Sequence, residues 1–392
     1  MASRRRARSR WVAATSLLSA LMIIAGQACS RSEPGPGPVP APHWSRVALP
    51  DGLDPTVLAL LPGSGGAAAE TLVGAQLTTN PPAPRLLRVT AGETVSPIPL
   101  EPVSPYARVA QFRALDSDGS RVVALGGRSG GAHGNVRWTV WTGTRAAVRE
   151  HPQTFETFGG QQAGALVDIV LTDRGPVVVG SWTGTAGGLD AAVWLPRGDT
   201  WLRRDSTGTP LASSKTRLVL ARAAVADGAA VVIAGSTIRL ADGVRQGAAV
   251  WRADSPDGDW RRTDLPDPGG RSEAQSVACS GDACWVAGQV DGRLALWSLM
   301  ASSAARTTLP DTAVDPSGPA ARVVSGPART VVAYSQDGHS RVLLGPSGGA
   351  GGWSRRTGPD GDLVDAVLQQ SRLYLLTRRG TGPAELWLAE LG

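Results

Sequence analysis

One segment near the middle of the chain decides the fold. It reads Ala248-Ala249-Val250-Trp251, then Ser255-Pro256-Asp257-Gly258, then Trp260-Arg261-Arg262-Thr263. An apolar run ending at Trp, a polar turn, and a second run in which Trp opens an alternation with Arg predict an antiparallel hairpin. Related hairpins are centred on Ala192-Val193-Trp194, Leu294-Ala295-Leu296-Trp297 and Arg341-Val342-Leu343-Leu344. The chain therefore repeats a unit of about fifty residues.

A second hairpin precedes each of these. Its later strand reads Val177-Val178-Val179-Gly180, Val231-Val232-Ile233-Ala234-Gly235 or Trp285-Val286-Ala287-Gly288. Four antiparallel strands in a unit that repeats around an axis are typical of a β-propeller. The second strands begin near residues 71, 121, 176, 229, 283, 330 and 372, which gives seven units. No segment after Trp44 keeps a helical apolar period, so we expect an all-β, seven-bladed β-propeller over residues 44–392.

The last unit ends without a fourth strand. The first residues after the Pro-rich segment, 44–50, share the pattern of residues 260–266, namely Trp, a polar residue, Arg and then Leu-Pro. An unpaired sheet edge invites aggregation. The sequence therefore predicts that the N-terminal strand at 44–50 completes the last blade, beside residues 385–391, and closes the ring.

The N-terminus has the layout of an export signal. Residues 2–10 carry five arginines and no acid, and residues 11–25 are apolar. About fifteen apolar residues are too few for a membrane span but fit a signal peptide. Residues 29–43 follow as a Pro/Gly-rich tether, and extended chain of this kind reaches roughly 40 Å. We expect a signal peptide at 1–28, the tether at 29–43 and the propeller from 44.

The segment Gly26-Gln27-Ala28-Cys29 resembles a bacterial lipobox, although Gly26 stands where leucine is usual. The resemblance implies that Cys29 becomes the lipidated N-terminal residue. The expected location is extracytoplasmic, on the outer face of the cell membrane through a lipid anchor. Ordinary cleavage near Ala28 and secretion is the alternative.

The formal net charge of +6 overstates the basic character of the domain. Five of these charges are Arg4, Arg5, Arg6, Arg8 and Arg10, so the chain beyond residue 28 carries +1. Nucleic-acid binding needs a basic stripe that displaces counterions. We therefore expect no nucleic-acid partner.

Two cysteines lie five residues apart, at Cys279 and Cys284. In an exported protein such a pair predicts a disulfide, here across the turn between the first two strands of the fifth unit. The four histidines have no zinc-ligand spacing. Asp116-Ser117-Asp118-Gly119 lacks the later acidic ligands of a calcium loop, so it predicts a turn. We expect no metal and no cofactor.

The turns at 255–260 and 198–201 resemble degenerate Asp-box repeats of the sialidase type. The whole chain is similar to seven-bladed β-propeller lipoproteins of actinobacteria. Resemblance to sialidases implies a Tyr nucleophile with an acidic partner and an arginine cluster. Tyr334 and Tyr374 lie in predicted second strands, where packing is the more common role, and the arginines gather mainly on the predicted fourth strands.

Function is the least determined property. No catalytic residue is assigned, and whether the protein is an enzyme stays open, with a non-enzymatic role favoured. The loops between second and third strands and those between blades share one face, where ligands of propellers usually dock. The candidate residues on that face are His133, Phe155, Phe158, Trp182 and Arg239. We expect an exported binding platform at the cell surface with a protein or glycan ligand; the alternatives are a sialidase-like hydrolase acting on glycans or a subunit of an envelope complex.

Overall fold

The structure is a computed structural model, and it describes residues 42–63, 68–130, 135–241, 243–266, 269–281, 283–300, 303–315, 318–347 and 352–391. The predicted signal peptide and nearly all of the predicted tether lie outside the described residues. Within the described residues, no helix is both long and apolar enough to cross a membrane.

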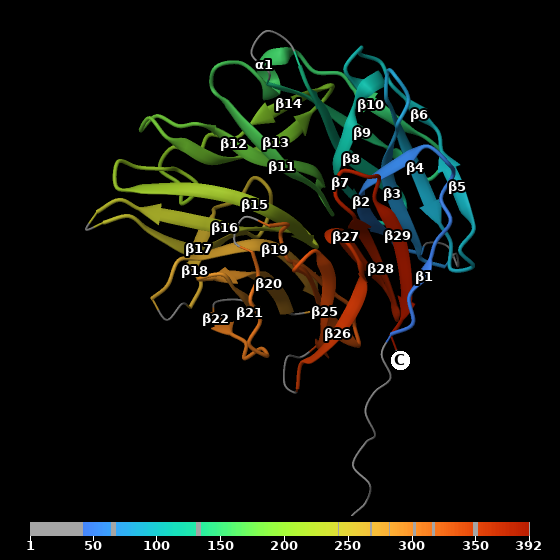
Figure 1. Cartoon of the computed structure of the whole chain (residues 1–392). Helices are drawn as coiled ribbons and strands as arrows, with labels where there is room; N and C mark the ends of the chain where they lie inside the picture. Colours follow the sequence, from blue (N-terminus) through green and yellow to red (C-terminus); the bar gives the residue numbers. More distant parts are fainter. Residues whose placement is uncertain are drawn as a thin grey trace, which may run out of the picture. The chain divides into compact units, whose positions relative to one another are not determined.

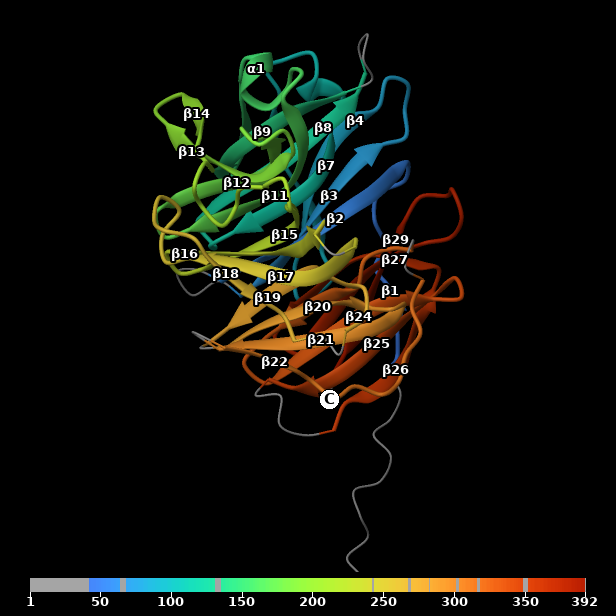
Figure 2. The ribbon, with the colours of Figure 1, turned by 90° about the vertical axis from the view of Figure 1, so that its left-hand side faces the viewer.

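The described chain folds into seven antiparallel sheets, which we call blades 1 to 7 and whose strands we call first to fourth from the centre outward. Figure 1 shows the sheets radiating from a centre formed by their first strands, and Figure 2 shows blades 3 to 6 side by side along the rim. The fold is the predicted seven-bladed β-propeller.

Blade 1 contains β2 (Leu53–Leu61), β3 (Glu70–Leu77), β4 (Ala83–Val89) and β5 (Val95–Ile98). Blade 2 contains β7 (Gln111–Ser117), β8 (Arg121–Ser129), β9 (Val136–Thr144), β10 (Val148–His151) and the short outer strand β6 (Leu100–Glu101). Blade 3 contains β11 (Ala163–Thr172), β12 (Gly175–Thr183), β13 (Leu189–Arg197) and β14 (Thr200–Arg203). Blade 4 contains β15 (Arg217–Asp227), β16 (Ala230–Arg239), β17 (Arg245–Ala253) and β18 (Arg261–Asp264).

Blade 5 contains β19 (Ser272–Ser280), β20 (Ala283–Val290), β21 (Arg293–Met300) and β22 (Ser303–Arg306). Blade 6 contains β23 (Arg322–Ser325), β24 (Arg329–Gln336), β25 (His339–Pro346) and β26 (Ser354–Asp360). Blade 7 contains β27 (Asp362–Gln369), β28 (Arg372–Arg378), β29 (Glu385–Glu390) and β1 (Ser45–Arg46). Two helical turns complete the described elements: η1 (Ala107–Val109) and α1 (Phe155–Phe158). Every second strand begins within one residue of its predicted start.

The predicted closure is confirmed. β1 pairs with β29 in antiparallel register, with Ser45 opposite Leu388 and Arg46 opposite Trp387 (Figure 1). The amide of Val47 extends the pairing by donating to the carbonyl of Leu386 at 2.9 Å. The sheet edge of blade 7 is thus covered by a segment from the other end of the chain.

The core is divided among the joints of the ring. Seven clusters of buried apolar side chains occur, and each contains residues of two neighbouring blades. The cluster that joins blade 7 to blade 1 includes Val47, Leu53 and Leu388. Burial of apolar surface stabilises by about 25 cal/mol per Å², so adhesion between blades is the main source of stability in this ring.

Tryptophans recur at the same place on the third strands, as predicted. Trp194, Trp251 and Trp297 are buried, and their indole N–H groups donate to the carbonyls of Thr157, Pro210 and Pro266. Each of these carbonyls lies in the connection that leads into the same blade. Trp387 occupies the matching place in blade 7 but is only partly buried, and its indole nitrogen has no hydrogen-bond partner within the described part of the chain.

Candidate functional site: an aromatic–arginine pocket

A pocket lies on the face formed by the connections between blades and those between second and third strands. Its cavity measures about 200 Å³. The lining residues are Tyr106, Val136, Arg137, Trp138, Gln153, Thr154, Phe155, Phe158 and Gly159. They come from the connection that enters blade 2, from the start of β9, and from α1 in the connection that leaves blade 2. The pocket is therefore on the face that the sequence predicts for ligand contacts.

Two sets of interactions hold the segment that contains Tyr106 against blade 2. β6 pairs in parallel with β10, with Leu100 opposite Val148. The buried carboxylate of Glu150 accepts hydrogen bonds from the backbone amides of Val103 and Ser104, at 2.7 and 2.6 Å. A buried carboxylate is stabilised when it accepts such bonds. The loop is thus held next to the pocket, and Tyr106 remains 47% exposed.

The other wall is the single turn α1. Phe158 is 4% exposed and packs edge-on against Trp194, with ring centroids 5.7 Å apart, so it fixes the turn to the core of blade 3. Phe155, on the same turn, is 43% exposed. A Cβ atom at Gly159 would stand 2.3 Å from the Phe155 ring, so the absence of a side chain there allows the ring to adopt its position.

Arg137 lies between the two exposed rings. Its guanidinium carbon is 4.0 Å from the centroid of Phe155 and 5.8 Å from that of Tyr106. Nε and Nη1 of Arg137 are shielded from solvent and have no hydrogen-bond partner among the described residues. Cation–π contact stabilises a guanidinium, but it supplies no acceptor for these N–H groups.

The predicted site residues are distributed as follows. His133 and Cys29 lie outside the described residues. Phe155 and Phe158 line the pocket. Trp182, 9% exposed, belongs to the core of blade 3, where its ring packs edge-on against Trp194 at 5.9 Å. Arg239 is exposed at the end of β16 and is not part of the pocket lining.

Sequence reasoning missed Arg137, Tyr106 and Trp138. Arg137 begins a third strand, where the alternation of polar and apolar residues predicts an exposed side chain. The signal that could have found it is local: Arg137 and Trp138 follow directly on the loop that was predicted to contact ligands.

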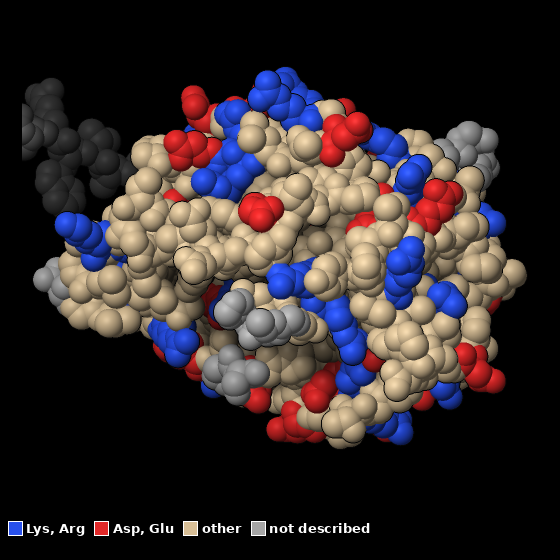
Figure 3. Space-filling model, turned by 90° about the horizontal axis from the view of Figure 1, so that it is seen from above, with Lys and Arg blue, Asp and Glu red and all other residues tan. Residues whose placement is uncertain are grey.

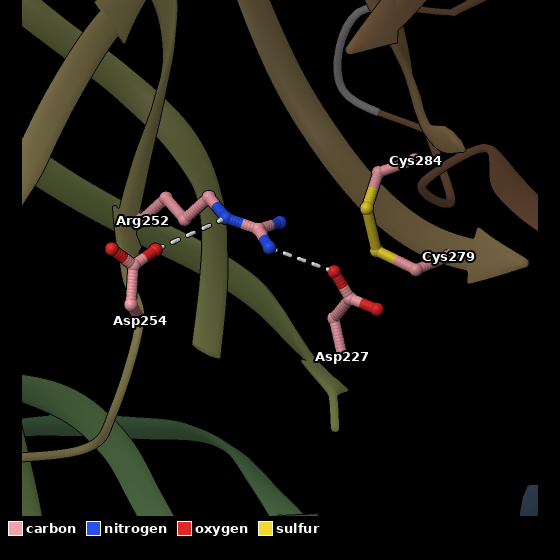
Figure 4. Close-up of a disulfide and its surroundings, with 5 residues drawn as sticks. All are labelled: Asp227, Arg252, Asp254, Cys279 and Cys284. Carbon is pink, nitrogen blue, oxygen red and sulfur yellow. Dashed lines mark hydrogen bonds and ion pairs between the residues drawn. A yellow bond between two sulfur atoms is a disulfide. The ribbon is translucent and has the colours of Figure 1, made fainter. Parts of the chain in front are cut away.

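The predicted disulfide between Cys279 and Cys284 is present, with the two residues paired across β19 and β20. Figure 4 shows it beside Asp227, whose carboxylate accepts from Arg252 Nη2 at 2.9 Å, and Arg252 also pairs with Asp254 at 3.8 Å. Asp227 and the two sulfur atoms lie within 4.8 Å of one another. Metal ligation requires thiolates, so in the disulfide form this group is not a metal site.

Carboxylates also occur on the innermost strands. Asp168 and Asp365 each follow a β-bulge of the first strand and accept the backbone amide of the next blade's first strand, from Ala224 and Leu58, both at 2.8 Å. Asp116 accepts from Leu171 in the same manner at 2.7 Å. In all three residues the second oxygen accepts the amide of the following residue. These side chains join neighbouring blades around the centre.

Burial dominates the protonation of these groups. It raises the pKa of Asp116 to about 6 and that of Asp168 to about 7, although both accept amide hydrogen bonds that favour the charged form. Burial also raises the pKa of Asp365, against the opposing effect of Arg322, whose Nε lies 3.2 Å from the carboxylate. Arg113, Arg222 and Arg322 lie on the first strands β7, β15 and β23, apart from the arginines that the sequence places mainly on the fourth strands.

Two further cavities lie at other joints. One of about 260 Å³ lies between blades 2 and 3, and one of about 570 Å³ between blades 4 and 5 next to the disulfide. The arginines that line the larger one, Arg252, Arg261 and Arg262, are all paired with aspartates. On the face shown in Figure 3, basic and acidic side chains are interspersed. Arg137 therefore differs from the paired arginines of the cavity between blades 4 and 5.

No protein-family model matches the sequence, and no curated protein matches it either. Among solved structures, the β-propeller domain of the trilobed protease from Pyrococcus furiosus, described as having an open velcro topology, is similar with a TM-score of 0.51 and 6% identity over 87% of this chain and 94% of that one. YCF48 bound to D1 peptide gives a TM-score of 0.51 and 11% identity over 89% of this chain and 97% of that one. The phage phi92 endosialidase gives a TM-score of 0.49 and 8% identity over 90% of this chain and 69% of that one, and we infer nothing about function from this similarity. At these identities the likeness concerns the fold alone, and the chain is a seven-bladed β-propeller.

Proposed function

We propose that the protein is an exported, lipid-anchored β-propeller that acts as a non-enzymatic binding platform, with the pocket at Tyr106, Arg137 and Phe155 as its contact site. The main supporting observation is that two half-exposed aromatic rings, Tyr106 and Phe155, pack against Arg137, whose Nε and Nη1 have no acceptor among the described residues. Aromatic and Arg side chains are the residue types that dominate binding hot spots. The export signal and the Cys29 anchor remain proposals that rest on the sequence.

The tyrosines argue against sialidase-like catalysis. Tyr334 and Tyr374 are fully buried within second strands, where a substrate does not reach their hydroxyl groups. Tyr106 lies at the pocket and, among the described residues, is not a hydrogen-bond partner of Asp116, Asp168 or Asp365. None of the three cavities is lined by Asp116, Asp168 or Asp365.

The platform is tested by photocrosslinking on intact cells. A benzophenone amino acid at Phe155 should give one discrete crosslinked product, whereas the same group at Met300, which is 55% exposed on the opposite face, should not give it. The product should disappear in the Tyr106→Ala background. Identical patterns from both positions, or no product from Phe155, would contradict the platform.

The anchor has its own test. Cys29→Ala should move the protein from the membrane fraction into the medium, because a single acylated cysteine is the proposed attachment point. An unchanged membrane fraction would refute lipidation at Cys29 while leaving the pocket untouched.

A second candidate, glycan hydrolysis at the centre of the ring, is favoured by one observation: the pKa of Asp168 near 7 is the kind of shift found in acid–base catalysts. Its test is turnover of aryl glycosides, including an aryl sialoside, by the full chain and by Asp168→Asn. Turnover that Asp168→Asn abolishes would replace the platform with an enzyme. We expect no turnover from either protein.

A further inference from the structure

We propose that the Arg137 pocket binds a carboxylate of a protein ligand, from an acidic residue flanked by apolar residues. This inference rests on the proposed function and names the ligand class of the same site. Its basis is the hydrogen bonding of Arg137, the contacts of the two rings with the guanidinium, and the volume of the cavity.

Two N–H donors of Arg137 lack an acceptor among the described residues. Nε and Nη1 of Arg137 are shielded from solvent and bond to no described residue, while Phe155 and Tyr106 pack against the guanidinium. A buried charged donor without a partner costs free energy. A ligand that supplies an anionic acceptor recovers this cost, and charge-assisted bonds to Arg are among the strongest hydrogen bonds in proteins.

The side chains around the pocket carry positive charge. Arg113 lies over the ring of Trp138 at 5.8 Å, so a second cation stands at the edge of the lining. Glu156, which follows Phe155 in the sequence, is exposed on α1 and forms no ion pair with Arg137 among the described residues. The two cations therefore favour a negatively charged ligand.

The pocket suits a carboxylate better than a phosphate. Only one guanidinium reaches the interior of the pocket, and it is stacked on aromatic rings. Burial of a doubly charged group against one cation leaves charge unpaired, which is costly. A planar, singly charged carboxylate matches the planar guanidinium and balances it.

The pocket suits a side chain of a protein better than a sugar ring. A sugar needs an open aromatic face for stacking, and one face of Phe155 and one face of Tyr106 are already occupied by Arg137. The cavity of about 200 Å³ is also smaller than the range of about 300–1,000 Å³ typical for whole small ligands. It has room for a side chain or two of a larger ligand, and the exposed ring edges provide apolar contact for the neighbouring residues.

The test compares matched peptides on the full chain. Acetyl-Gly-Leu-Asp-Leu-amide should bind at least tenfold more tightly than its Asn counterpart, measured by ligand-observed NMR titration. Arg137→Met, which keeps the apolar stem against Phe155, should abolish this preference, and Arg137→Lys should keep only part of it. Arg306→Met removes an exposed arginine of blade 5, outside the pocket, and should leave the preference unchanged. Thermal unfolding of each variant controls for folding.

Three outcomes would overturn the proposal: equal binding of the Asp and Asn peptides or no binding of either, a preference that survives in Arg137→Met, or tighter binding of the phosphoserine counterpart or of methyl glucuronide. The result is separable from the platform itself. Crosslinking at Phe155 that depends on Tyr106 would still support a contact site, even if the Asp peptide had no advantage.

Discussion

At the scale of single residues, the molecule uses buried polar groups in two ways. Asp168 and Asp365 satisfy both carboxylate oxygens with backbone amides, one of which belongs to the next blade. Arg137 has its stacking partners, but Nε and Nη1 have no acceptor among the described residues. The first arrangement is complete within the chain, whereas we propose that a ligand completes the second.

The Asp168 arrangement predicts a dependence of stability on pH. Since burial raises the pKa of Asp168 to about 7, the folded protein binds a proton more tightly than the unfolded chain does between pH 4 and 7. The contribution of this residue to the free energy of unfolding is therefore largest at low pH and falls as the pH rises through 7.

The measurement is urea unfolding of the wild type and Asp168→Asn at pH 5 and pH 8. The wild type should lose more stability than the variant on going to pH 8, by a difference on the order of 2 kcal/mol, because each pKa unit corresponds to about 1.4 kcal/mol. A difference that does not change with pH would show that Asp168 titrates near its ordinary pKa.

The recurring tryptophans provide a second residue-scale prediction. Trp251→Phe removes the indole N–H that donates to the carbonyl of Pro210 at 2.9 Å, and it leaves that carbonyl without its donor. Trp387→Phe makes the same change in side-chain size at a position without such a bond. In thermal unfolding, Trp251→Phe should cost about 1 kcal/mol more than Trp387→Phe. Equal costs would mean that the indole bond contributes nothing beyond packing.

At the scale of elements, the strand pattern was largely predictable and the polar contacts were not. Short runs of β-branched and aliphatic residues predicted the start of every second strand to within one residue, because such a run bounded by turns is recognised from local sequence. β6 was missed, since two residues, Leu100 and Glu101, carry no pattern and pair only because the rest of blade 2 is present. The central aspartates were missed for a related reason, because their partners lie in another blade.

The turn between β19 and β20 yields a prediction for an element. The disulfide closes a short loop, with a sequence separation of five residues, and the chain-entropy model gives it about 2 kcal/mol. Replacing both Cys279 and Cys284 with alanine should lower the free energy of unfolding by about that amount. Crosslinking at Phe155 should not change, because the turn lies on the other face. Loss of the crosslink in a folded double variant would show that the two faces are coupled.

At the scale of the whole molecule, stability depends on the closure of the ring. Blade 7 contributes three strands from the end of the chain and receives β1 from its beginning, and Val47 is buried at the joint with blade 1. A neighbouring ion pair, Arg46 with Glu385 at 3.3 Å, is largely exposed on the arginine side and adds little.

The closure is tested by Val47→Asp against Arg46→Ala. Val47→Asp places a charge in the apolar joint and should lower the unfolding midpoint strongly, by about 3 kcal/mol or more in free energy, because a buried unpaired charge is among the most destabilising changes. Arg46→Ala should cost less than about 1 kcal/mol. Proteolysis should then cut the Val47→Asp variant first within blade 7 or blade 1. Equal stability of the two variants would indicate that the ring does not need this segment.

The parallel strand β6 has a consequence for how the protein can meet other chains. An extended segment of another protein often binds by adding to an open sheet edge through main-chain hydrogen bonds. In blade 2 that outer edge at β10 is already occupied by β6 at Leu100 and Glu101. A chain that binds at the proposed pocket therefore finds Val148 and Arg149 already paired, so its side chains, rather than backbone pairing with these residues, would determine the specificity of the contact.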